Sequence, residues 1–126
     1  MRLDIVLCAI AAAGLSAPVL AESGDMQIGT FLAKAEALKS RGVMAAFSGD
    51  GQLLKREFEA ADKRYQTRKA ELRAAHQPPE SCEPPNASVS LDEFLAHLRS
   101  YPEASRRTVS ISSATADLMK KRFPCR

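Results

Sequence analysis

The chain has little of the material from which large cores and catalytic sites are built. Its 126 residues include no tryptophan, five phenylalanines, two tyrosines and two histidines. So few aromatic rings exclude a core built around large side chains, and the length favours one small domain with a mostly aliphatic core. A glycine-rich phosphate loop is also missing from the sequence, because Gly49 and Gly51 by themselves indicate only a turn.

The sequence contains no recognisable catalytic set. No serine or cysteine is accompanied by a base and an orienting residue at a known motif spacing, so we predict that the protein is not an enzyme. His76 and His97 are expected to be surface or hydrogen-bonded histidines. A cation site formed by Asp92, Glu93 and His97 is an alternative, but Glu93 is expected to serve in a helix capping box. We therefore predict no metal and no cofactor.

The N-terminus has the features of a secretory signal peptide. Arg2 precedes an apolar run from Ile5 to about Leu20, and small residues end the segment at Ala21. A membrane anchor is the alternative, although the run is short for a span and Pro18 interrupts it. We predict a signal peptide at residues 1–21 and a periplasmic domain at residues 22–126.

Cysteine is scarce, and its placement indicates a disulfide. Cys8 would leave with the signal peptide, so Cys82 and Cys125 would remain in the exported chain. A pair of cysteines in an oxidising compartment favours a bridge, and two cysteines without matching histidines make a poor zinc site. A Cys82–Cys125 disulfide would contribute ~4 kcal/mol by restricting the unfolded chain.

The charge balance is mildly basic, with a formal net charge of +3. We interpret this charge as an aid to solubility, with binding to anionic envelope surfaces as a lesser alternative. Because exported proteins seldom meet nucleic acid, no nucleic-acid partner is predicted. No stable membrane anchor is expected once the signal peptide is removed.

Hydrophobic periodicity predicts an all-α fold, a small bundle of about four helices in which the second is the longest. The helices are expected at residues 26–42, 50–76, 90–102 and 108–123, with a connector of at most one helical turn at 43–51. The residues expected on the buried faces are Phe31, Leu32, Ala35, Leu38, Leu54, Phe58, Ala61, Tyr65, Leu72, Leu91, Phe94, Leu95, Leu98, Ile111, Ala114, Leu118 and Met119.

Two polar segments follow from this pattern. The second helix mixes charges of both signs, which is typical of a solvated face; the alternative is that its surplus of arginine and lysine faces an acidic partner. The next segment, "QPPESCEPPNA" at residues 77–87, contains four prolines, which exclude helix and strand. Cys82 lies in the middle of this stiff loop.

The C-terminal part of the chain resembles the Rap/Tai family of immunity proteins. The most specific feature is a Phe123-Pro124-Cys125 ending paired with an upstream Cys82-x-Pro84. The resemblance covers roughly residues 80–125, whereas residues 22–75 depart from the family pattern. The other matching positions are Leu91, Leu95, Leu98, Tyr101, Pro102 and Leu118.

The resemblance implies a small helical periplasmic protein that binds and blocks a peptidoglycan amidase effector delivered by type VI secretion. The alternative is a periplasmic helical scaffold or adaptor without a toxin partner. For an inhibitor, we expect the binding surface near the disulfide, where the stiff proline loop, the start of the third helix and the end of the fourth are held together, with contacts at Glu80, Glu83 and Asn86. The cations that would steer an acidic partner toward it are Lys120, Lys121, Arg122 and Arg126; the alternative is that these charges serve only the dipole of the last helix.

Overall fold

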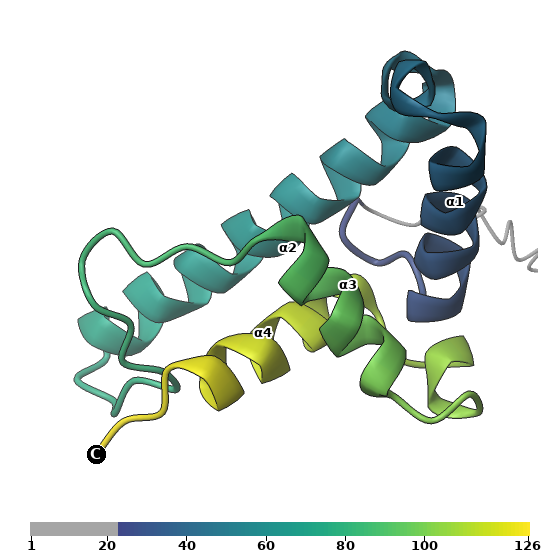
Figure 1. Ribbon diagram of the computed structural model, residues 1–126. Helices are drawn as coiled ribbons and strands as arrows, with labels where there is room; N and C mark the ends of the chain where they lie inside the picture. Colours follow the sequence, from purple (N-terminus) through teal and green to yellow (C-terminus); the bar gives the residue numbers. More distant parts are fainter. Residues whose placement is uncertain (1–22) are drawn as a thin grey trace, which may run out of the picture.

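The computed structural model describes residues 23–126, which form a helical domain (Figure 1). The predicted signal peptide and Cys8 lie outside the described residues. Within residues 23–126 there are four α-helices and two short 3-10 helices, and no strand. Their bounds are α1 Ile28–Arg41, η1 Val43–Phe47, α2 Gly49–Ala74, α3 Leu91–Ser100, η2 Ser105–Arg107 and α4 Ile111–Arg122.

Serine caps start three of the four α-helices. Ser48, Ser90 and Ser110 each accept a backbone N–H from the first turn of α2, α3 and α4 with the side-chain hydroxyl. The first helix ends at Gly42, whose φ of 87° is open to glycine but strained for other residues.

The elements of residues 23–126 confirm the all-α prediction and the predicted order of the helices.

The core lies where α1, α3 and α4 meet α2. Phe94 is its centre, with its ring edge-on to Phe31 at 5.8 Å and to Phe58 at 4.9 Å between centroids. The other buried members of this cluster are aliphatic, as the composition predicts: Ile28, Leu32, Leu54, Ala61, Leu98, Ile111, Ala114 and Leu118.

The structure corrects two sequence-based expectations and adds a buried carboxylate. Leu91, expected in the core, is 59% exposed. It is the first residue of α3, and it lies before Phe94 and Leu98, which are the residues of this helix that are buried. Ser90 caps α3 as predicted, but the Glu93 carboxylate accepts a hydrogen bond from Arg122 at 2.9 Å. Glu57, expected on the charged face of the second helix, is buried.

Glu57 is buried because it holds the segment that precedes α1. Its carboxylate accepts the backbone N–H groups of Gly24 at 2.6 Å and Met26 at 3.3 Å. On the other side of this segment, the carbonyl of Gly24 accepts the hydroxyl of Ser112 at 2.7 Å. We call this arrangement the N-terminal clasp. It fixes the start of the described chain between α2 and the first turn of α4.

The 26-residue α2 is the long axis of the domain, about 39 Å at 1.5 Å per residue. Figure 1 shows η1 at one end of this helix and the proline loop at the other, with α4 running alongside. Among the described residues, no helix is long and apolar enough to cross a membrane. η1 and the proline loop therefore lie at opposite ends of α2.

Candidate functional site

The proline loop is held at the predicted disulfide. Cys82 and Cys125 are bonded, with their Cα atoms 4.9 Å apart. Beside the bridge, the backbone N–H of Cys82 donates to the carbonyl of Phe123 at 2.8 Å. The bond and the hydrogen bond together join the loop to the residues just after α4, so the loop has a preformed shape.

Glu80, predicted to contact a partner, lies against α2. Its carboxylate accepts two hydrogen bonds from the Arg68 guanidinium, at 2.7 and 2.9 Å. This two-point contact with Arg68 lowers the pKa of Glu80, more than burial raises it. Glu80 thus ties the start of the proline loop to the last third of α2.

Glu83 is more deeply engaged, with a side chain only 12% exposed. Burial opposes its charge, yet hydrogen bonds from Lys69 and Ser81 outweigh burial and lower the pKa of Glu83. Ser81 is buried and also hydrogen-bonded to Tyr65, whose own pKa is raised by burial. Glu83 therefore belongs to a polar network that seats the loop on α2.

Asn86 is the outward-facing member of the three predicted contact residues. It is exposed, and its φ of 64° places it in the left-handed region that asparagine tolerates better than most residues. Pro84 and Pro85 beside it are exposed as well. Next to the hollow, the free surface of the loop thus includes two prolines and an amide, whereas both carboxylates pair with side chains of α2.

A hollow of about 420 Å³ lies between the loop, α2 and α4. Phe58, Phe94 and Leu118 contribute apolar surface, and Asn86 and Glu83 contribute polar groups at the loop side. This volume lies within the roughly 300–1,000 Å³ range of small-molecule pockets, so the volume by itself does not distinguish a small molecule from an inserted side chain of a partner. The hollow adds a recess next to the outward face of the loop.

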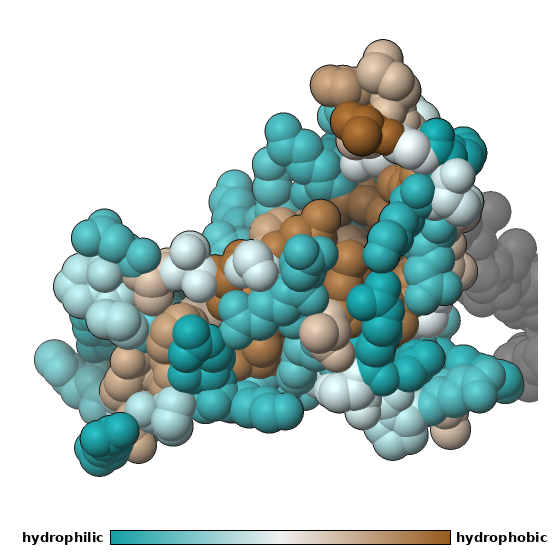
Figure 2. All heavy atoms as spheres, in the orientation of Figure 1, coloured by the Kyte–Doolittle hydropathy of each residue, from teal (hydrophilic) through white to brown (hydrophobic). Residues whose placement is uncertain are grey.

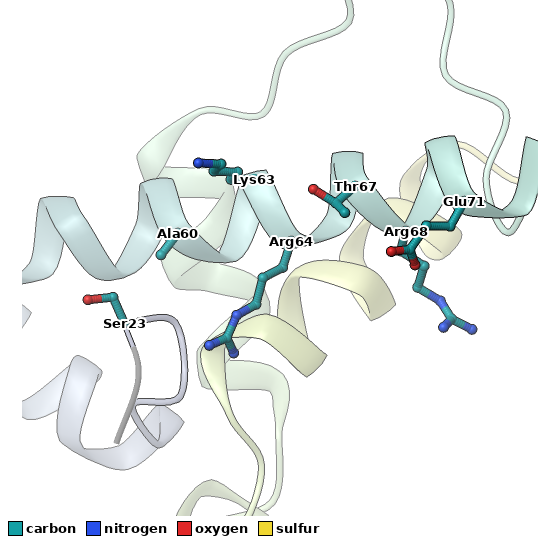
Figure 3. A pocket seen from close by; sticks show the side chains of 7 residues that line it. All are labelled: Ser23, Ala60, Lys63, Arg64, Thr67, Arg68 and Glu71. Atoms are coloured by element: carbon teal, nitrogen blue, oxygen red, sulfur yellow. The ribbon is translucent and has the colours of Figure 1, made fainter. Parts of the chain in front are cut away.

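The basic face of α2 forms a shallow depression of about 390 Å³ near Ser23 (Figure 3). Lys63 and Arg64 extend to different sides of the helix there. Arg64 pairs with Asp25 and contacts the hydroxyl of Ser112 at 3.3 Å, and Arg68 pairs with Glu80. Two arginines of the α2 face for which an acidic partner is the alternative are therefore already paired within the domain.

The opposite end of α2 carries a surface that the sequence patterns did not identify. In η1, the side chains of Val43, Met44 and Phe47 are 86%, 77% and 73% exposed, respectively. Figure 2 shows this hydrophobic group at the top of the molecule, above a largely hydrophilic flank. The signal in the sequence was the presence of three large apolar residues in a connector too short to bury them.

The histidines fit structural roles. Nε2 of His97 lies 3.1 Å from the carbonyl oxygen of Ala114, which only accepts, so Nε2 carries the proton. Burial lowers the pKa of His97. His76 is an exposed residue with a φ of 54° just after α2. Across residues 23–126, no group of three or more His, Cys, Asp or Glu side chains is placed to hold a metal ion.

The candidate surfaces are thus the outward face of the proline loop with its adjacent hollow, and the apolar turn η1. Both are built by this chain's own contacts, one by a disulfide and a polar network and the other by a tight connection between α1 and α2. Comparison of the chain with protein-family models, curated proteins and solved structures found no match.

Proposed function

We propose that the chain is a periplasmic immunity-type protein that binds a type VI secretion peptidoglycan amidase effector and blocks its active site. The observation that carries the proposal is the clamped proline loop, in which Cys82 is bonded to Cys125. The same residues, Cys82-x-Pro84 and Phe123-Pro124-Cys125, carry the resemblance to the Rap/Tai family. A loop that is already ordered loses less conformational entropy on binding.

The inward pairing of the carboxylates sharpens the proposed contact surface. Glu80 and Glu83 are engaged with Arg68 and Lys69, so they support the loop from beneath. The direct contacts are then expected from Asn86, the exposed prolines and the neighbouring hollow. Removal of a supporting carboxylate acts on binding through the shape of the loop.

Steering by the last turn of α4 is reduced by an internal ion pair. Arg122 is exposed but bonds to Glu93, which leaves Lys120, Lys121 and Arg126 as the exposed cations of this segment that are not in an ion pair. Such charges on the rim of an interface raise the association rate more than the affinity. The proposal therefore expects charge reversal at Lys120 and Lys121 to slow binding and to leave dissociation nearly unchanged.

The test is protection during co-expression with peptidoglycan amidase effectors directed to the periplasm. Asn86→Gly removes the amide side chain and keeps a residue that accepts the positive φ, and it is compared with Gln52→Ala, which removes an exposed amide near the other end of α2. Survival with the parent chain, loss of protection in Asn86→Gly and retention in Gln52→Ala would support the proposal. Lysis with the parent chain and every effector tested would contradict it.

The second candidate is a periplasmic scaffold or adaptor, favoured by the exposed apolar turn η1. Affinity isolation from an envelope extract with mass spectrometry distinguishes the two functions. A stoichiometric amidase indicates the inhibitor, and recovery of envelope assembly components through η1 indicates the adaptor.

A further inference from the structure

The apolar turn η1 presents three large side chains in five residues. A 3-10 helix has three residues per turn, so Met44 and Phe47 lie on one side and Val43 lies next to them, while Ala45 turns inward and is buried. Single exposed apolar residues, such as Leu91, are common on proteins and need no explanation. Three adjacent ones form a patch, and such patches mark interaction surfaces.

This turn is held in place by its surroundings. A Cβ added to Gly51 would lie 2.3 Å from the carbonyl oxygen of Ala46, so the first turn of α2 packs directly on η1. Ser48 caps α2 at the junction. Asp50 pairs with Lys34 at 3.0 Å and with Arg41 at 3.7 Å, which fastens the start of α2 to α1. The apolar side chains are therefore displayed on a firm support.

Positive charge surrounds the apolar turn. Residues 39–56 contain one carboxylate, Asp50, and four cations, Lys39, Arg41, Lys55 and Arg56, a net charge of +3. This equals the formal net charge of the whole chain, so the rest of the sequence is balanced. The next carboxylates along the sequence are Glu36, which pairs with Arg99, Glu57, which is buried, and Glu59, which pairs with Lys55. Lys39 and Arg56 are the exposed cations of this stretch that are not in an ion pair.

We propose that η1 docks the protein on the surface of an anionic membrane. Val43, Met44 and Phe47 would enter the boundary between headgroups and acyl chains, and the surrounding cations would remain among the lipid phosphates. The turn lies at the end of α2 and projects there (Figures 1 and 2), a shape that suits a deformable lipid surface. This inference is independent of the proposed inhibitor function, which uses the other end of α2.

Binding of this kind is reversible and needs both the insertion of apolar side chains and the attraction between cations and lipid phosphates. Side chains of one turn bury limited apolar surface, so insertion alone holds weakly, and the cations alone are screened by salt. The proposal therefore expects binding that falls with rising ionic strength and with loss of any large apolar side chain. Burial of a phenylalanine side chain corresponds to a change of about tenfold or more in partitioning.

The test is co-sedimentation of the exported protein with vesicles of equal parts phosphatidylglycerol and phosphatidylcholine, beside vesicles of phosphatidylcholine alone. Its N-terminus is read by mass spectrometry, because an uncleaved apolar run at residues 5–20 would bind lipid by itself. Phe47→Ser is compared with Leu91→Ser, because Leu91 is also a large apolar residue that is exposed, but on α3. Lys39→Glu/Lys55→Glu is compared with Lys120→Glu/Lys121→Glu on α4. Circular dichroism confirms that each variant is folded.

The expected result is binding to the anionic vesicles only, weakened about tenfold by Phe47→Ser, weakened by Lys39→Glu/Lys55→Glu and unchanged in both controls. Absence of binding to anionic vesicles at low salt would overturn the proposal. Equal losses in Phe47→Ser and Leu91→Ser would also overturn it, because they indicate non-specific apolar adsorption. If the parent chain does not bind vesicles and Phe47→Ser abolishes binding to an isolated protein partner, η1 fits a protein groove and the membrane assignment is wrong.

Discussion

The two ends of α2 carry connections of opposite construction. At its C-terminal end the proline loop is tied by a covalent bond, ion pairs and a buried serine, and its outward face is polar or proline. At its N-terminal end η1 is short, close-packed on the helix and apolar on the outside. The comparison shows that the two ends of one helix are built by different means, a covalently closed loop and a close-packed turn that is apolar on the outside, so changes at each end should have different consequences.

The largest effect is expected from the disulfide. Replacing both Cys82 and Cys125 with serine should lower the free energy of unfolding by ~4 kcal/mol, because the bridge closes a loop with a sequence separation of 43. Urea denaturation monitored by circular dichroism measures this loss. Hydrogen exchange in the native state should rise around the loop and stay unchanged at η1. A loss under about 1 kcal/mol would indicate that the ion pairs, and not the disulfide, stabilise that end of α2.

The next effect distinguishes two glycines at the other end. Gly51→Ala should destabilise by about 1–3 kcal/mol, since the new methyl group meets the carbonyl oxygens of Ala46 and Ala45. Gly49→Ala is the matched control, because its Cβ meets nothing within 4 Å and alanine is the better helix former. Thermal unfolding of both variants checks this. If the two had equal stability, the close packing of α2 on η1 would be in doubt.

A smaller effect is expected from the polar network of the loop. Glu83→Gln should cost about 1–2 kcal/mol, because a charged acceptor of hydrogen bonds from Lys69 and Ser81 is lost. The folded pKa of Glu83 lies below its ordinary value of 4.5, so the folded protein binds fewer protons than the unfolded chain. The stabilisation is therefore present above pH 4.5 and is lost as the pH falls through the folded pKa.

Denaturation of both chains between about pH 3 and 7 measures this contribution, since these values bracket the ordinary carboxyl pKa. The parent chain should lose more stability than Glu83→Gln on acidification. Parallel curves would indicate that the Glu83 carboxylate contributes nothing measurable.

The smallest effect on stability is expected at η1. Phe47→Ser should change the free energy of unfolding by no more than about 0.5 kcal/mol, because the ring is 73% exposed. Differential scanning calorimetry measures this change. A marked loss of stability would mean that the ring packs within the domain, which would remove the basis for a docking surface at this end.

Local patterns predicted most of the fold. The 3.6-residue spacing of apolar residues located four helices, and the count of cysteines outside the predicted signal peptide predicted the bridge between Cys82 and Cys125, which is confirmed. Both signals require only the chain itself. The capping serine at position 90 is predictable for the same reason, because it bonds to a residue three positions away.

Pairings between distant segments were not predictable. Nothing near Glu57 in the sequence indicates that it accepts N–H groups more than 30 residues away. Likewise, the sequence does not indicate that Glu80 and Glu83 of the proline loop form ion pairs, because their partners Arg68 and Lys69 lie on α2. Exposure of η1 depends on how α1 and α2 meet, which a periodicity argument does not describe.

The N-terminal clasp has a consequence for the order in which the domain is completed. Gly24 is synthesised early, yet its carbonyl is held by Ser112, 88 residues later. The buried carboxylate of Glu57 also has its N–H partners in the early segment. The N–H groups of Gly24 and Met26 can pair once α2 exists, but the Gly24 carbonyl has to wait for Ser112 on α4, so the clasp is complete only after residue 112 has been made.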